Sequence, residues 1–294
     1  MTGASPGPIQ HVVPKHYLKG FADSPERTHV WVYNKGQAYS TGNEINKRRN
    51  PFRQAIRSAG AAPGVYRLVT LAGDHVDEDP TITKQEGWGV EVLQKLRAQA
   101  PISVQDKVRF SLYIDLMRDR VPARAIHALP FVREAMKNYG WDLLQRKAAE
   151  EGRFALARKF DPRLPESVAA LEQELLLRGV TQRSHVIVKQ IARMRWLFFT
   201  VDGDRFFPTM DNPAFFPPGL GLAKDNGFMM MPIDSRMVLL ACNVPGDDRQ
   251  YIPATPAQYT LFRNVILAGA TEKAYASRND PDILDMLNSP RLPA

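Results

Sequence analysis

Cysteine is nearly absent from this 294-residue sequence, and long apolar runs are missing altogether. The single cysteine, Cys242, excludes a disulfide within the chain and any zinc site built from several thiolates. It lies in the apolar run 237–242, which predicts a buried, unreactive thiol. No stretch approaches the roughly 20 apolar residues that cross a bilayer, and residues 1–8 lack the basic start and apolar core of a signal peptide. We therefore expect a cytoplasmic protein without a membrane anchor.

The signatures of several common enzyme classes are missing as well. The sequence has no glycine-rich loop ending in Gly-Lys-Ser/Thr and no dinucleotide fingerprint. It also has no His-Glu-x-x-His motif and no Gly-x-Ser-x-Gly elbow. The common types of nucleotide-dependent enzyme, zinc protease and serine hydrolase thus receive no support.

The sequence has the composition of an ordinary globular protein, with an excess of basic over acidic residues. Apolar residues make up 44% and charged residues 24%, so the chain can bury a sizeable core without cross-links such as disulfide bonds. Lysine and arginine number 39 against 31 aspartate and glutamate, so the net charge is +8. This charge favours nucleic acid or another polyanion as a partner, and it equally serves solubility. Both interpretations stay open.

Patterns along the chain predict an α+β fold in a single elaborated domain over residues 10–294, preceded by a flexible tail at 1–9. Strand patterns dominate segments 10–80 and 195–294, whereas 81–194 has helical periodicity. Because the strands and the helices come in separate runs, we do not expect a doubly wound fold. We expect the N- and C-terminal strands to form one mixed or antiparallel sheet, with a helical lobe between them.

Local signals place the individual elements. In the N-terminal region we expect a short helix at 14–21, a β-hairpin at 28–40, an exposed basic loop or short helix at 41–64, and a strand at 65–71. In the C-terminal region we expect a second hairpin at 195–207 around Asp202-Gly203, and strands at 229–233 and 237–241. Helices are predicted at 83–99, 103–117, 122–150, 166–178, 182–194, 255–269 and 282–288. The hairpin run predicts that Trp196, Phe198 and Val201, or the alternates Leu197 and Phe199, line a buried sheet face.

The string His11-Val-Val-Pro-Lys-His16-Tyr17-Leu18 is dense in groups that transfer protons or stack on ligands. His11 is a candidate catalytic residue because imidazole titrates near neutrality, and Tyr17 is a candidate binding residue. The alternative is structural. Leu18 and Phe21 would then dock the short helix, and His11 would hydrogen-bond within a turn.

Further candidates lie near the ends of other predicted elements. Asp211 could act as a base or a metal ligand, with Asn212 as a binding residue, although both residues also form Asx turns readily. Arg120 follows the helix at 103–117, where its guanidinium could bind phosphate or simply complement the helix dipole. Glu91, in the helix at 83–99, is a fourth catalytic candidate.

Together these pieces resemble a known family. The residues that carry the resemblance are His11-x-x-Pro14-x-x-Tyr17-Leu18-x-x-Phe21, Val30-Trp-Val-Tyr33, Arg120-x-Pro122, Phe207-x-x-x-Asp211-Asn212-Pro213 and Met231-Pro232-Ile233-Asp234. In order and spacing they are similar to the bacterial family catalogued as domain of unknown function 4238. The resemblance covers most of the chain, and it implies no established activity, substrate or catalytic residue.

Two hypotheses of function remain. In the first, His11, Arg120 and Asp211 converge, with Glu91, to hydrolyse a phosphoester in nucleic acid, and a divalent metal ion could be held by His11, Glu91 and Asp211. In the second, the same groups are structural and the protein is a non-catalytic binding module for nucleic acid or an acidic protein partner. Its binding residues would then include the exposed basic segment with Lys47, Arg48, Arg49, Arg53 and Arg57. Neither the substrate nor the oligomeric state follows from the sequence.

Overall fold

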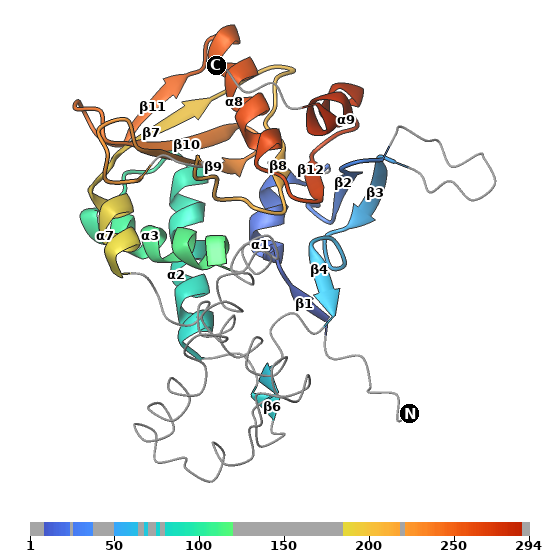
Figure 1. Cartoon of the computed structure of the whole chain (residues 1–294), viewed down its shortest axis with the longest axis horizontal. Coiled ribbons are helices and arrows are strands. Elements are labelled where there is room, and N and C mark those ends of the chain that lie inside the picture. Colours follow the sequence, from blue (N-terminus) through green and yellow to red (C-terminus); the bar gives the residue numbers. More distant parts are fainter. Residues whose placement is uncertain are drawn as a thin grey trace, which may run out of the picture.

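The computed structural model describes residues 9–23, 26–37, 50–63, 68–69, 75–76, 80–119, 185–217 and 221–289. Within these ranges the chain forms two four-stranded sheets, and helices cover both faces of one of them (Figure 1). The predicted α+β class is confirmed.

The first sheet joins strands from the two ends of the sequence, as predicted. Its order is β3-β2-β12-β8, and all of its pairs are antiparallel. The strands are β2 (His29–Asn34), β3 (Phe52–Ala55), β8 (Thr209–Met210) and β12 (Lys273–Ala276). The return strand predicted after the turn at 34–36 lies largely outside the described residues. Within them, the partners of β2 are β3 and β12.

The second sheet has the order β11-β7-β10-β9, in which β11 runs parallel to β7 and the other pairs are antiparallel. The strands are β7 (Arg195–Thr200), β9 (Phe228–Asp234), β10 (Met237–Cys242) and β11 (Gln250–Pro253). The hairpin predicted at 195–207 is wrong, because β7 pairs with β10 and β11. The backbone N–H groups of Val201 and Phe207 instead donate to Arg236 and Ser235 in the turn after β9. A buried strand must pair its backbone N–H and C=O groups along both edges, and a two-stranded hairpin would leave one edge of β7 unpaired.

Two short ladders and one short helix complete the N-terminal region. The ladders are β1 (Ile9–His11) with β4 (Ala61–Pro63), and β5 (Leu68–Val69) with β6 (His75–Val76). The helix predicted at 14–21 is confirmed as α1 (Lys15–Leu18) and a 3-10 turn, η1 (Lys19–Phe21). The basic segment contains the strands β3 and β4 instead of a plain loop. Its Arg53 and Arg57 are exposed, as predicted.

Most of the predicted helices within the described residues are found within three residues of their expected ends. They are α2 (Pro80–Arg97), α3 (Val104–Asp119), α7 (His185–Arg193), α8 (Pro256–Ala268) and α9 (Pro281–Asn288). The helices predicted at 122–150 and 166–178 lie outside the described residues. No helix among the described residues is both long enough and apolar enough to cross a bilayer.

Side-chain caps explain why two of these helices begin where the sequence predicted. At the start of α3, the Ser103 hydroxyl accepts from the Asp106 N–H at 3.0 Å, and Asp106 accepts from the Ser103 N–H at 2.9 Å. Thr255 and Gln258 form the same reciprocal pair before α8, where Pro256 occupies the first turn. Each pair satisfies backbone donors that the helix itself leaves unpaired.

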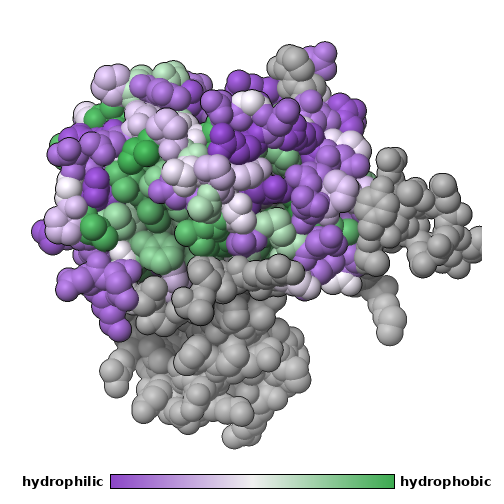
Figure 2. Space-filling model, turned by 90° about the horizontal axis from the view of Figure 1, so that it is seen from above, coloured by the Kyte–Doolittle hydropathy of each residue, from purple (hydrophilic) through white to green (hydrophobic). Residues whose placement is uncertain are grey.

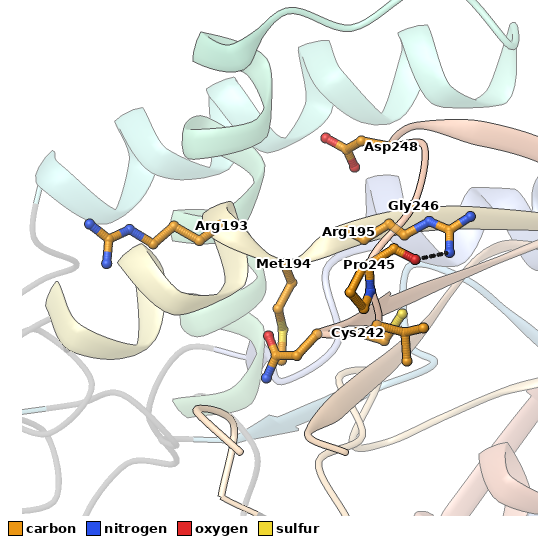
Figure 3. Close-up of a pocket in the computed structure, with 9 residues that line it drawn as sticks. Arg193, Met194, Arg195, Cys242, Pro245, Gly246 and Asp248 are labelled. Carbon is orange, nitrogen blue, oxygen red and sulfur yellow. Dashed lines mark hydrogen bonds between the residues drawn. The ribbon is translucent and has the colours of Figure 1, made fainter. Parts of the chain in front are cut away.

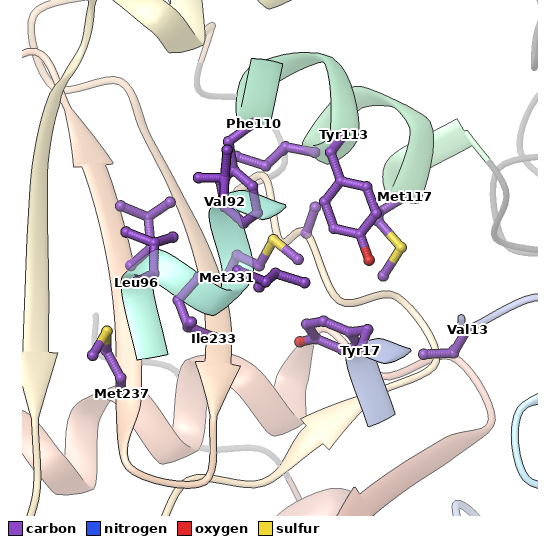
Figure 4. Packing of buried hydrophobic residues seen from close by; sticks show 14 of the residues in the cluster. Val13, Tyr17, Val92, Leu96, Phe110, Tyr113, Met117, Met231, Ile233 and Met237 are labelled. Carbon is purple, nitrogen blue, oxygen red and sulfur yellow. The ribbon is translucent and has the colours of Figure 1, made fainter. Parts of the chain in front are cut away.

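Two hydrophobic clusters lie on opposite faces of the second sheet. On the inner face, side chains of α2 and α3 meet β9 and α1, and Figure 4 shows Leu96 and Phe110 packed near Met231 and Tyr17. On the outer face, α8 covers the sheet, and the rings of Phe262 and Phe199 lie 4.7 Å apart. The aromatic run of β7 thus supplies both clusters. Trp196 and Phe198 face one and Leu197, Phe199 and Val201 the other, which confirms the predicted burial.

Candidate functional site

The N-terminal string meets the segment before Asp211 through one buried hydroxyl. The Tyr17 hydroxyl donates to the carbonyl of Pro232 at 2.6 Å and lies 2.8 Å from the hydroxyl of Thr209. A tyrosine hydroxyl has one proton, so Thr209 must donate to Tyr17. Burial raises the pKa of Tyr17. Because the ring is fully buried, Tyr17 joins α1 to both sheets and cannot touch a ligand directly.

Arg97 closes the same junction from α2. Its guanidinium donates to the carbonyls of His16, Tyr17 and Ile233 at 3.1 to 3.3 Å. A Cβ atom at Gly20 would collide with this guanidinium, so the close approach requires glycine. Burial lowers the pKa of Arg97 and raises that of Asp234, and the opposite charges of the two groups counteract both shifts. We call Tyr17, Arg97, Thr209 and Asp234 the motif junction.

Asp211 holds the start of β12. Its two carboxylate oxygens accept three backbone N–H bonds, from Thr271 at 2.9 Å, Glu272 at 2.7 Å and Lys273 at 3.1 Å. Burial raises the pKa of Asp211, and these three bonds counteract the shift. The carboxylate therefore has a structural role that its place before Pro213 did not disclose.

His11 and Asn212 each have a buried polar atom, Nδ1 of His11 and Oδ1 of Asn212, that has no hydrogen-bond partner among the described residues. His11 is half-buried in β1, and burial lowers its pKa, with the charge of Lys15 adding to the shift. Glu91 is exposed on α2 and forms an ion pair with Arg109 at 3.7 Å.

The contacts of the described residues do not link the predicted catalytic residues to one another. Within the described ranges, no hydrogen bond or ion pair connects His11, Glu91 and Asp211 to one another. Arg120 and the basic residues Lys47, Arg48 and Arg49 lie outside those ranges. In the same part of the chain, no three His, Cys, Asp or Glu side chains are grouped as a metal ion would require.

A pocket of about 270 Å³ lies elsewhere, between the end of α7, the start of β7 and the loop after β10 (Figure 3). Its lining residues are Arg193, Met194, Arg195, Cys242, Asn243, Val244, Pro245, Gly246 and Asp248. Cys242 is buried, as predicted. This pocket was not predicted from the sequence, although Pro245-Gly246, shortly after the apolar strand β10, is the kind of turn signal that could have drawn attention to it.

Arg195 fixes the shape of the pocket. Its Nε donates to the carbonyl of Asp247 at 2.6 Å and its Nη1 to that of Pro245 at 3.2 Å. Gly246 lies beneath the guanidinium with φ 141°, and a Cβ atom there would be 2.6 Å from Nη1. Asn243 ties the loop to the neighbouring segment by donating to the carbonyls of Leu222 and Lys224, both at 2.6 Å. The pocket wall is thus held by hydrogen bonds to backbone.

The carboxylate in the pocket is fully engaged. Asp248 accepts from the N–H groups of Trp196 at 2.7 Å and Arg249 at 3.0 Å, and from Nζ of the buried Lys107 at 2.8 Å. Burial alone would raise the pKa of Asp248, but the bonds from Lys107 and Trp196 outweigh it and lower the pKa. In contrast, no hydrogen bond or ion pair to a described residue holds the exposed guanidinium of Arg193. Arg193 and Arg195 extend in opposite directions from the pocket (Figure 3).

The fold and this pocket define an α+β protein of two four-stranded sheets with arginines beside a polar pocket. The chain matches the model of the family described as "Protein of unknown function (DUF4238)" over residues 9–280. It therefore belongs to that family, which confirms the resemblance drawn from its motifs. No curated protein and no solved structure matches the chain.

Proposed function

We propose that this protein is a non-catalytic binding module whose pocket, lined by Arg193 and Arg195, receives an acidic segment of a partner protein. The observation that supports this most strongly is the exposed guanidinium of Arg193, which has no hydrogen bond or ion pair to a described residue and lies beside a wall of fixed shape. A wall held in advance loses little conformational entropy when a ligand binds.

The charge of the pocket favours an anionic ligand. Asp248 is neutralised locally by Lys107, whereas Arg193 has no carboxylate partner among the described residues. Because the two arginines point in opposite directions, one small anion is a poor match for both. An extended segment with several carboxylates could reach one guanidinium with each end, and each charge-assisted bond adds orientation as well as affinity.

The lining favours a peptide over nucleic acid. None of the nine residues around the pocket is aromatic, so none offers a ring on which a base could stack. The exposed Val244 and Pro245 instead supply apolar surface of the kind that side chains of a peptide contact.

Binding of acidic peptides, measured by fluorescence anisotropy at low and moderate salt, tests the proposal. A fluorescein-labelled peptide of alternating glutamate and glycine should bind, and Arg193→Gln should weaken binding about fivefold, the loss of about 1 kcal/mol expected for an exposed charge-assisted bond. Arg57→Gln is the matched control, because Arg57 is an exposed arginine in the turn after β3, in the region of the first sheet. Equal affinities for both variants, or tighter binding of RNA or DNA of the same charge, would overturn the proposal.

One observation keeps phosphoester hydrolysis as a second candidate. Within the described part of the chain, the buried Nδ1 of His11 has no hydrogen-bond partner, and burial lowers the pKa of the His11 imidazole, which favours the neutral form that a general base requires. The test is a screen of the protein against RNA, DNA and phosphoesters, with and without divalent metal ions. Activity that His11→Ala abolishes while the melting temperature is unchanged would support catalysis. Absence of turnover by the wild type, or a lowered melting temperature with unchanged activity in His11→Ala, would refute catalysis by His11.

A further inference from the structure

One edge of the second sheet has no strand partner among the described residues. β11 forms this edge, and the strand to which it is hydrogen-bonded in that part of the chain is β7. The N–H of Arg249 donates to the carbonyl of Trp196 at 2.7 Å. Donors on one side of a strand recur at every second residue, so the N–H of Tyr251 also points toward β7, and those of Gln250 and Ile252 point away from it. We call Gln250 and Ile252 the free edge.

The exposure of β11 agrees with an open edge. Gln250, Tyr251 and Ile252 are half-buried and Pro253 is exposed, whereas the four central residues of β7 are all buried. Both faces of β11 are packed, because Tyr251 stacks on Phe198 at 4.9 Å on the inner face and Ile252 packs against the cluster under α8. The accessible surface of β11 therefore lies along its outer edge. In Figure 1 β11 is the uppermost strand of this sheet, and Figure 2, seen from above, shows hydrophobic residues at the surface on that side.

The free edge starts beside the pocket. Asp248, which lines the pocket, is two residues before Gln250, and β11 runs parallel to β7, whose first residue, Arg195, lines it too. The exposed Arg249 lies between the pocket and the free edge, and its Nε is 3.5 Å from a carboxylate oxygen of Asp248. The exposed Asp247 accepts from the side-chain amide of Gln250 at 3.2 Å. An extended chain that leaves the pocket along β11 therefore passes a further arginine before it reaches the free edge.

Charge at the two ends of β11 favours an acidic strand over a second copy of the chain. Arg249 lies at the start of β11. At its end, Arg205 donates to the carbonyl of Ala254 at 3.3 Å and lies 3.6 Å from a carboxylate oxygen of Asp202. In an antiparallel pair of two β11 strands, Arg249 of one copy would come near Arg205 of the other, and like charges opposite each other destabilise a ladder. A segment with carboxylates meets no such repulsion.

We infer that the free edge takes up the acidic segment of the partner protein as an added β-strand, with the carboxylates of the segment toward Arg249 and the pocket. This inference rests on the proposed binding function and specifies the conformation of the ligand. Backbone hydrogen bonds from Gln250 and Ile252 supply affinity that does not depend on sequence. Side chains of the added strand that lie beside Tyr251 and Ile252 favour β-branched residues. The ligand is thus an extended segment in which a short β-forming run adjoins several carboxylates.

Amide hydrogen exchange followed by NMR tests the inference on the full chain. In the free protein, the amide of Ile252 should exchange at least about tenfold faster than that of Tyr251, which donates into the ladder. The probe is a peptide of five alternating threonines and valines followed by five glutamates, used together with its reversed sequence because an added strand can run in either direction. Saturation with the tighter peptide should slow exchange of Ile252 at least about fivefold and leave Tyr251 unchanged. Unaltered exchange at Ile252 with both peptides would overturn the inference.

A proline substitution removes one donor of the free edge and leaves the ladder intact. Ile252→Pro deletes an N–H that points away from β7, a position at which edge strands accept proline, whereas the matched control Ile252→Val retains it. In fluorescence anisotropy, Ile252→Pro should weaken the tighter peptide about three- to tenfold, as expected for one backbone hydrogen bond, and Ile252→Val less than about twofold. Melting temperatures show whether both variants fold. Equal affinities of the two folded variants would contradict strand addition.

N-methylation of the peptide gives the same test on the wild-type protein. Alternate amides of an added strand point toward β11, so methylating one alternate set should weaken binding at least about threefold, and methylating the other set should have little effect. This comparison stands even if Ile252→Pro does not fold. Equal binding of the two methylated peptides would refute the strand.

Arg193→Gln separates the inference from the function on which it rests, because it should weaken every acidic peptide, methylated or not. If only Arg193→Gln has an effect, the acidic ligand is supported and its strand conformation is refuted. If Arg193→Gln has no effect either, the proposed function fails as well. Sedimentation velocity should show a monomer. A dimer whose formation protects the Ile252 amide without peptide would show that a second copy occupies the free edge, and would overturn the partner strand.

Discussion

Tyr17→Phe is the most informative single substitution, because it removes one oxygen atom and leaves the ring in place. The hydroxyl is the hydrogen-bond partner of two groups, the Pro232 carbonyl and the Thr209 hydroxyl. Each buried polar group left without a partner costs about 1–3 kcal/mol. We therefore expect Tyr17→Phe to lower the free energy of unfolding by about 2–4 kcal/mol, measured by urea titration with circular dichroism.

A double-mutant cycle with Thr209→Val isolates the contact. The two single variants should cost more in sum than the double variant, by about 1 kcal/mol, because the second substitution removes a group that the first had left unsatisfied. Tyr251→Phe is the matched control, since its hydroxyl lies 3.5 Å from the Ala100 carbonyl and makes at best a weak bond. A cost of less than about 0.5 kcal/mol for Tyr17→Phe, or purely additive effects, would refute the role assigned to the motif junction.

Three further outcomes follow from the described geometry. Asp211→Asn should destabilise the fold by about 1–3 kcal/mol in urea titration, because an amide can turn only one acceptor oxygen toward the three N–H donors. Burial lowers the pKa of His11 from 6.5, so its contribution to stability is present above that pH and is lost as the pH falls through the folded-state pKa. Thermal melts should therefore show the wild type losing more stability than His11→Gln between about pH 7.5 and pH 5, and parallel curves would contradict this. Gly246→Ala should displace the Arg195 guanidinium and weaken acidic-peptide binding about as much as Arg193→Gln, with anisotropy as the measurement.

Elements with local signals could be predicted from the sequence. The start of α3 was predicted from the capping pair Ser103 and Asp106, three residues apart, and that of α8 from Thr255 as its first residue. The hairpin at 195–207 could not be recognised as false, because Asp202-Gly203 is a valid turn signal in itself. What decides the pairing of β7 is that the backbone groups along both of its edges pair with strands 37 to 53 residues later in the chain.

The candidate site was harder to predict for a different reason. The residues chosen from the sequence were polar side chains in motifs, and Tyr17 and Asp211 proved to bind backbone groups and a hydroxyl inside the fold. The pocket depends on backbone carbonyls beside Arg195 and on the conformation of Gly246, and neither has a side-chain pattern. Arg193 carries no local signal that distinguishes it from the other exposed arginines of a basic chain.

The first sheet also constrains how the protein is made. β2 is hydrogen-bonded to β12, and the Tyr33 hydroxyl donates to the carbonyl of Arg278, 245 residues further along the chain. At the usual rate of about 5–20 residues per second, a ribosome needs about 12 to 50 s to add that length. Throughout this time the edge of β2 that will pair with β12 has no partner, and an unpaired edge can pair with other chains. A chaperone that covers this edge of β2 on the nascent chain should therefore raise the yield of folded protein.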